Sequence, residues 1–274
     1  MFFYILIKQI IKEQTIFGET QSLSLILYLT TYMNLGIRKN LRKWLLQGNN
    51  VECPCCGNHF ITFLPAGKPV RFNASCPHCY ALERHRLLWL FLFNEDNVWL
   101  KKEIKLLHVA PEFIFYKKLR KMQNLHYAPG DKFMPGYNYP RGVKDIDISS
   151  LIFSDNYFDA ILCNHVLEHV PNDIQAMEEL YRVLKPEGWA ILQVPIDYNR
   201  ETTYDDNTIV TPEEREKHFG QHDHLRLYGR DYEERLRKAG FMVTKIDYGN
   251  TFNQSDKIRY GLDKNDTIIY FCKK

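Results

Sequence analysis

The sequence has no long hydrophobic run. Residues 1–32 hold two apolar pieces, but charged residues such as Lys8, Lys12 and Glu19 interrupt them. Neither piece reaches the roughly 18 uninterrupted apolar residues of a membrane span, and no small-residue cleavage site of a signal peptide follows them. The sequence therefore predicts no membrane span. Met33 begins a segment typical of a natural start, so residues 1–32 are either an extension that precedes the true first residue or a part of the native protein.

Charge of one sign is also scarce. The formal net charge is +3 and the pI about 8.3, which does not require a nucleic acid as partner, although a local basic patch would still bind one. In residues 33–50, Leu35, Leu41 and Trp44 alternate with arginines and lysines, which predicts an amphipathic basic helix. This helix either packs on the next domain or contacts phosphates or another anionic surface.

Cysteine is sparse except in one segment. Five of the seven cysteines lie between Cys53 and Cys79, a spacing that favours a metal site over disulfides. Two Cys-x-x-Cys pairs supply the four thiolates of a closed, structural zinc site, with Cys55 and His78 as spare donors. The predicted zinc ligands are Cys53, Cys56, Cys76 and Cys79. We expect a zinc-ribbon-like module over residues 51–80, with short strands at 60–64 and 70–72, and its reduced thiolates favour a cytoplasmic location.

The composition leaves room for a substantial core. The chain has 274 residues, 45% of them apolar, which suits one large α/β domain with a small appendage. Residues 158–163 form an apolar run typical of a buried strand, residues 171–184 have helical spacing, and residues 189–194 form a second buried strand. A β-α-β unit with a crossover of this length predicts parallel strands.

The segments FDAILCNHVLEH and RVLKPEG in this unit resemble class I methyltransferases that use S-adenosylmethionine, within the type 11-like group. The resemblance implies an α/β, Rossmann-like seven-stranded sheet, mostly parallel with an antiparallel last strand. It also implies S-adenosylmethionine as cofactor and methyl transfer as the reaction. The implied domain order is a docking helix over residues 81–100 and a methyltransferase domain over residues 101–274, with an insertion at 196–228.

Glycine is missing from the loop after the first strand of that domain, where the family usually has an acidic residue and a glycine-rich turn. Aligned by strand, His108 stands where the acidic residue is usual, Ala110 at the first glycine and Glu112 at the second. The resemblance therefore implies that His108, Val109, Ala110 and Glu112 face the cofactor. We expect the Glu112 carboxylate to accept from the cofactor's ammonium group.

The resemblance implies the remaining cofactor contacts. Asp131, the first acidic residue after the second strand, would accept from both ribose hydroxyls, with an ordinary turn aspartate as the alternative. Asp147 and Ile148 would contact adenine, with Asp145 as the competitor of Asp147. The floor of the cleft lies at the carboxyl end of the central strand, and its residues are Cys163, Asn164 and His165.

The acceptor side is expected in residues 221–229, which concentrate side chains able to move protons or bind anions. We predict Arg226 and Tyr228 as substrate contacts, and a plain solvated loop is the alternative. If the acceptor arrives protonated, the candidate proton acceptors are His224, Asp223 and His165.

Two short patterns allow more than one interpretation. Residues 83–86 either contact the substrate or the cofactor's carboxylate, or form a salt-bridge cluster at a helix start. Residues 165–169 match H-x-x-E-H, an inverted zinc-peptidase signature, but that class needs both histidines on one helix, and here a strand precedes the first. We instead expect His165 to line the cleft, and Glu168 and His169 to steady the following helix start.

The methyl acceptor is not identified by the sequence; a small molecule, a glycan and RNA all remain open. The rival function is a zinc-ribbon module that binds nucleic acid or protein, with a degenerate, non-catalytic methyltransferase body. Nothing in the sequence indicates the oligomeric state.

Overall fold

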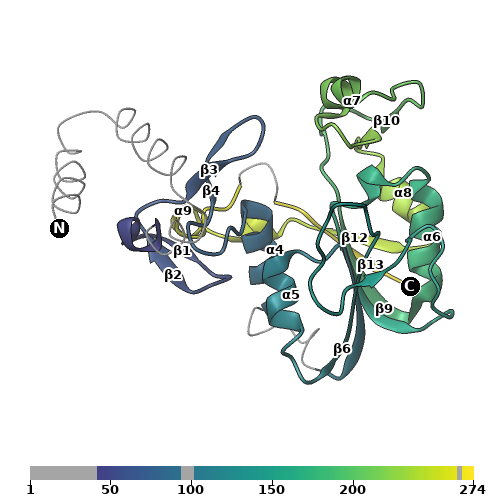
Figure 1. The fold of residues 1–274 in the computed structure, drawn as a ribbon, viewed down its shortest axis with the longest axis horizontal. Helices are drawn as coiled ribbons and strands as arrows, with labels where there is room; N and C mark the ends of the chain where they lie inside the picture. The colour runs from purple at the N-terminus through teal and green to yellow at the C-terminus, as the bar shows by residue number, and fades with distance from the viewer. Residues whose placement is uncertain (1–41, 94–101, 264–266) are drawn as a thin grey trace. The chain divides into compact units, whose positions relative to one another are not determined.

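The computed structural model describes residues 42–93, 102–263 and 267–274 (Figure 1). The predictions for residues 1–32 and for most of the basic helix at 33–50 lie outside the described residues. Within the described part of the chain, no helix is both long and apolar enough to cross a membrane.

The chain forms two compact units, which are described separately. The first comprises Met1–Glu83 and Ile258–Gly261, and the second comprises Arg84–Lys257 and Leu262–Lys274. The described part of the first unit contains two antiparallel hairpins, β1–β2 and β3–β4. Their strands are β1 (Gln47–Cys53), β2 (Asn58–Phe60), β3 (Leu64–Ala66) and β4 (Arg71–Ser75).

The predicted strand at residues 60–64 is wrong, because the structure divides it. β2 ends at Phe60 and β3 begins at Leu64. Between them, Phe63 N–H donates to Asn73 Oδ1 (2.9 Å), a side-chain acceptor outside the β1–β2 ladder. The first Cys-x-x-Cys pair begins at Cys53, the last residue of β1, and the second begins at Cys76, directly after β4.

The second unit is built on a seven-stranded sheet with the order β12-β13-β9-β8-β5-β6-β7. The strands from β9 to β7 pair in parallel, whereas β13 is antiparallel to both β9 and β12. The predicted Rossmann-like sheet with a reversed last strand is thereby confirmed. The strands are β5 (Ile104–Val109), β6 (Leu125–Asp131), β7 (Lys144–Asp145), β8 (Phe158–Asn164), β9 (Leu184–Gln193), β12 (Met242–Ile246) and β13 (Ile269–Lys273).

Both faces of this sheet are buried. Side chains alternate along a strand, so that Leu106 packs in one core and its neighbour Leu107 in the other. This two-sided burial explains why the central strands read as nearly continuous apolar runs. The core that contains Leu106 is covered by α4 (Glu83–Phe93) and α5 (Phe113–Leu119). The core that contains Leu107 is covered by α6 (Asp173–Val183) and α8 (Tyr232–Lys238).

The RVLKPEG motif spans the junction between α6 and β9. α6 begins after Asn172, whose side chain accepts from Gln175 N–H as an N-cap. β9 begins at Leu184, earlier than the predicted start at Trp189, and residues 185–188 bulge from the ladder because the register with β8 shifts there. The helix therefore passes into the strand without an intervening loop.

The stretch between β9 and α8 contains only short elements. α7 begins at Pro212, because Thr211 and Glu214 form a capping box there. β10 and β11 pair antiparallel. The remaining elements are β10 (Tyr204–Asp205), α7 (Pro212–Phe219), β11 (Arg226–Leu227), the 3₁₀ turns η1 (Leu167–His169) and η2 (Tyr248–Thr251), and α9 (Gln254–Tyr260).

Asp173, the first residue of α6, connects this helix to the stretch between β9 and α8 and to α8 itself. Its carboxylate is buried and accepts hydrogen bonds from Tyr228 Oη (2.8 Å) and from Arg235 Nη2 (2.8 Å). Arg226 is buried beside it and donates to three backbone carbonyls of the chain before α6, those of Leu167, Val170 and Pro171. These bonds hold β11 against η1.

Replacing Asp173 by alanine should lower the free energy of unfolding by about 3 kcal/mol, because it leaves the buried Arg226 and the half-buried Arg235 without their carboxylate. The matched control is Glu178→Ala, an exposed position on the same helix, for which a change within about 0.5 kcal/mol is expected. Urea unfolding followed by circular dichroism measures both. Equal destabilisation by the two variants would contradict this role of Asp173.

Candidate functional site

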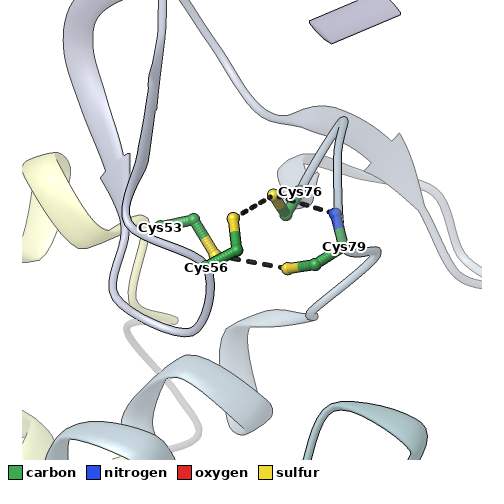
Figure 2. A group of neighbouring side chains, drawn as sticks. All are labelled: Cys53, Cys56, Cys76 and Cys79. Atoms are coloured by element: carbon green, nitrogen blue, oxygen red, sulfur yellow. Dashed lines mark hydrogen bonds between the residues drawn. The ribbon is translucent and has the colours of Figure 1, made fainter. Parts of the chain in front are cut away.

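Four cysteine sulfurs converge in the first unit (Figure 2). Cys53 Sγ lies 3.5 Å from Cys79 Sγ, and Cys56 Sγ lies 3.8 Å from Cys76 Sγ; all four lie within 4.8 Å of one another. A tetrahedral zinc with bonds of about 2.3 Å needs sulfur–sulfur distances of about 3.8 Å. The four sulfurs therefore fit a closed thiolate site.

The two cysteine turns repeat one backbone conformation. Gly57 follows Cys53 at the same spacing as Tyr80 follows Cys76, and the two residues have φ angles of 66° and 62°. Each donates its N–H to the carbonyl of that cysteine, at 2.8 Å and 3.0 Å. Glycine adopts this left-handed conformation freely, whereas a tyrosine there is strained. The turn from Cys76 to Tyr80 has no glycine that would mark it in the sequence, so only the cysteine spacing indicates it.

In the second unit a pocket lies at the carboxyl ends of β5 and β8, the edge where open parallel sheets bind ligands. Its polar lining comes from four places. These are the start of α4 (Arg84 and His85), the loop after β5 (Glu112), the end of β8 (Asn164 and His165) and the end of β9 (Gln193). Burial lowers the pKa of His85 to about 4, so this imidazole is neutral at pH 7.

The residues of segment 83–86 lie in different surroundings. Arg84 and His85 line the pocket. Glu83 instead pairs with Arg71 in the first unit, with 3.0 Å between Glu83 Oε1 and Arg71 Nε, and Arg86 is fully buried.

His108 is fully buried and reaches the pocket through Glu112. Its Nε2 lies 2.8 Å from Glu112 Oε2, and its Nδ1 lies 2.9 Å from Tyr127 Oη. Burial opposes the charge on Glu112, but the hydrogen bond and charge of His108 outweigh it and lower the pKa of Glu112 to about 2. Glu112 is therefore a carboxylate at neutral pH, oriented by His108.

Two polar atoms of this pocket have no hydrogen-bond partner within the described part of the chain. Asn164 Oδ1 accepts nothing, although Asn164 Nδ2 donates to Glu112 Oε1 (3.2 Å), and Arg84 Nε donates to nothing. A carboxylate with a nearby amide oxygen suits an ammonium group, and a guanidinium suits a carboxylate. The pocket thus matches the two charged ends of an α-amino acid, which S-adenosylmethionine carries.

The loops that follow β5 and β8 turn sharply at residues other than glycine. Ala110 has a φ of 44° and His165 a φ of 54°, a conformation strained for any residue with a Cβ. Glycine would adopt this conformation without strain. Val109 and Cys163, just before these turns, are buried at 2% and 0% exposure and do not line the pocket.

The residues predicted for ribose and adenine lie at the ends of β6 and β7. Asp131 and Asp145 are opposite each other in the ladder, and burial, reinforced by the charge of Asp145, raises the pKa of Asp131. Asp147 accepts from Lys132 Nζ (2.7 Å), which lowers the pKa of Asp147. Ile148 is buried. A second pocket is lined by Lys132, Phe133, Asp145, Ile146, Asp147, Ser150 and Ile152.

Three histidines surround the buried carboxylate of Glu168. His165 Nδ1 lies 3.4 Å from Glu168 Oε1, and ring nitrogens of His169 and His224 lie within 4.8 Å of a Glu168 oxygen and of each other. Asp223 is exposed and faces His169, with 3.4 Å between its Oδ2 and His169 Nδ1. We expected Glu168 and His169 only to steady a helix start; the H-x-x-E-H pattern was the signal of this cluster.

The two predicted substrate contacts have structural roles instead. Arg226 is 4% exposed and donates to backbone carbonyls, and Tyr228 is 0% exposed and donates to Asp173. Burial raises the pKa of Tyr228 well above its usual value. β11 has only two residues, so the sequence there shows no alternation from which the burial of Arg226 and Tyr228 could have been predicted.

The strand order and the pocket at the strand ends define a class I methyltransferase fold. Residues 128–192 match the family described as "Methyltransferase domain". The matched segment runs from β6 to β9, so the centre of this sheet has the fold of a methyltransferase domain.

Other likenesses are partial. A stretch of 48 residues is 48% identical to an uncharacterized protein of Methanocaldococcus jannaschii, and it covers 18% of this chain and about a fifth (21%) of that protein. A chain from the complex of the Haloferax volcanii Trm112 methyltransferase activator with a methyltransferase matches at 15% identity and a TM-score of 0.40, over 63% of this chain and 83% of that one. A Bacillus halodurans methyltransferase matches at 17% identity and a TM-score of 0.40, over 68% and 93%. None of these identifies the acceptor.

The Glu112 carboxylate should make the stability of the protein sensitive to acid. Its pKa in the folded chain is about 2, below the ordinary 4.5, so its charge stabilises the fold above about pH 4.5 and that contribution is lost as the pH falls toward 2. The difference in unfolding free energy between wild type and Glu112→Gln should therefore be largest above pH 4.5 and shrink below it. For the exposed Glu103→Gln it should stay near zero throughout; a pH-independent Glu112→Gln difference would contradict the assignment.

Proposed function

We propose that the protein moves the methyl group of S-adenosylmethionine to its acceptor by in-line displacement, and that the pocket beside Glu112 binds the amino-acid end of the cofactor. The observation that supports this most is the charge pattern of the pocket. Glu112 and Asn164 Oδ1 suit the ammonium group, and the unpartnered Arg84 Nε suits the carboxylate.

The other cofactor contacts follow the strand ends. Asp131 would accept from the ribose hydroxyls, and Asp147 with Ile148 would contact adenine beside the second pocket. The backbone at Val109 and Ala110, and that of Cys163, would lie against the cofactor, with His108 acting through Glu112.

Bound S-adenosylmethionine supplies an activated methyl group, so the protein mainly supplies alignment. The acceptor atom would take the methyl group while the sulfur–methyl bond breaks, and the sulfur would keep the electron pair of that bond. The acceptor, whether a small molecule, a glycan or RNA, would approach from the side of His165, which lines the cofactor pocket.

A protonated acceptor needs a base, and His224 is the first candidate. Burial lowers the pKa of His224 and keeps the imidazole neutral at pH 7. His165 is the second candidate, because it belongs to both the pocket and the Glu168 cluster. Asp223 faces His169, so its part in the proposal is to orient that imidazole.

Glu112→Gln should weaken S-adenosylmethionine binding roughly tenfold to hundredfold, because it removes a charge-assisted hydrogen bond to the ammonium group. Isothermal titration calorimetry measures the affinity. Glu103→Gln is the control, since Glu103 is exposed and pairs with His126, and it should bind like wild type. Unchanged affinity in Glu112→Gln would rule out the proposed contact, and no binding by wild type would favour a non-catalytic body.

The four-cysteine cluster is proposed to hold a structural zinc. Four thiolates leave no open coordination position, so such a zinc stabilises the fold and takes no part in the reaction. Because metal-binding thiolates remain reduced in the cytoplasm, this cluster is the basis for placing the protein there.

Cys56→Ser should abolish one equivalent of tightly bound zinc, whereas Cys55→Ser should keep it, because Cys56 belongs to the converging group and its neighbour Cys55 does not. Inductively coupled plasma mass spectrometry of the purified proteins measures the metal content. Loss of zinc in both variants, or retention in both, would show that the four ligands are assigned wrongly.

A further inference from the structure

A second group of side chains able to hold a metal ion shares no residue with the four-cysteine cluster or with the pocket beside Glu112. Glu168 and His169 belong to η1, and His224 precedes β11. One carboxylate oxygen and one nitrogen of each imidazole lie within 4.8 Å of one another. We propose that Glu168, His169 and His224 form a binding site for a divalent transition-metal ion.

The buried carboxylate is the first argument for this site. Glu168 is 1% exposed, and its Oε2 has no hydrogen-bond partner among the residues that the structure describes. An unpaired charged oxygen is costly in the interior of a protein. A bound cation would remove that cost, because the oxygen would then have a partner of opposite charge.

The hydrogen bonds of the two imidazoles are the second argument. His224 Nδ1 lies 3.2 Å from the carbonyl oxygen of Phe219, and His169 Nδ1 lies 3.2 Å from the carbonyl oxygen of Asp223. Because a carbonyl only accepts, each Nδ1 must carry the hydrogen, which leaves the lone pair on Nε2. A bound ion would take this lone pair of His224, so with the ion bound His165 and not His224 is the candidate base. Metal-binding histidines are held in this way by a carbonyl or carboxylate on their other nitrogen.

The donor set indicates the kind of ion. Two imidazole nitrogens and one carboxylate oxygen suit zinc, iron(II) or cobalt(II), and magnesium or calcium would prefer oxygen donors only. Ligand atoms around a tetrahedral ion with bonds of about 2.0 Å lie about 3.3 Å apart. Metal binding would therefore draw these side chains together, which the 32% exposed side chain of His169 can follow.

Rigid surroundings support the site and distinguish it from the peptidase pattern. The backbone N–H of Leu225 donates to the carbonyl of Glu168 (2.8 Å), and Arg226 fixes η1 through its carbonyl contacts. The second histidine ligand thus comes from a different segment, His224, and not from His165 of H-x-x-E-H. Because His169 is partly exposed, one side of the site remains open to solvent.

The test is a titration of wild type, Glu168→Gln and His224→Ala with cobalt(II) chloride, without S-adenosylmethionine, followed by absorption spectroscopy and metal analysis. Wild type should bind one more equivalent of cobalt(II) than either variant. Binding of this additional cobalt(II) should not add to the thiolate-to-cobalt charge-transfer band that the cysteine cluster gives. His222→Ala is the control, because His222 is an exposed neighbour of the site, and it should keep the additional equivalent.

Equal cobalt uptake by wild type and Glu168→Gln would overturn the proposal, and so would loss of the additional equivalent in His222→Ala. Glu168→Gln preserves the shape of the side chain, so it serves as the folded comparison if His224→Ala is unstable by circular dichroism. S-adenosylmethionine affinity, measured separately on the same proteins, reports on the proposed methyl transfer. The metal site and the binding of S-adenosylmethionine are therefore tested independently, and one can fail without the other.

Discussion

One buried carboxylate holds the inserted stretch between β9 and α8 against the residues that follow β8. Asp173 accepts from Tyr228 and Arg235, and the side chains of Arg226 and Arg235 are only 4% and 20% exposed. Charges so far removed from water need an opposite charge close by. Although Tyr228 and Asp173 are 55 positions apart in the chain, this requirement holds the two segments together, and it brings His224 to the histidines after β8.

The loop after β5 places one carboxylate at the pocket. His108, at the end of β5, is fully buried. It hydrogen-bonds to Glu112 in the following loop and keeps that carboxylate ionised. Negative charge is therefore available at the pocket. Ala110 keeps the left-handed turn without glycine, and its strain is tolerated because its N–H is bonded to Gly130 (2.8 Å).

Much of the fold could be predicted because its signals are local. The apolar run at β8, the helical spacing of α6 and the length of the crossover are sufficient to predict a parallel sheet, and the cysteine spacing predicted the converging sulfurs. The boundary errors have local causes too: the Asn73 side chain interrupts a predicted strand, and a bulge extends β9 back to Leu184. The ribose, adenine and base assignments remain predictions, since they depend on ligands that only experiments can supply.

The sequence alone determined the parallel α/β sheet and the identity of the candidate zinc ligands, because periodicity and cysteine spacing act over a few residues and depend little on the rest of the chain. Only the tertiary structure decided that Arg226 and Tyr228 face inward, that Arg84 joins Glu112 in one pocket, and that His224 meets Glu168. Those outcomes depend on which buried charges and hydrogen-bonding groups find partners across the folded chain, and that pairing has no local pattern in the sequence.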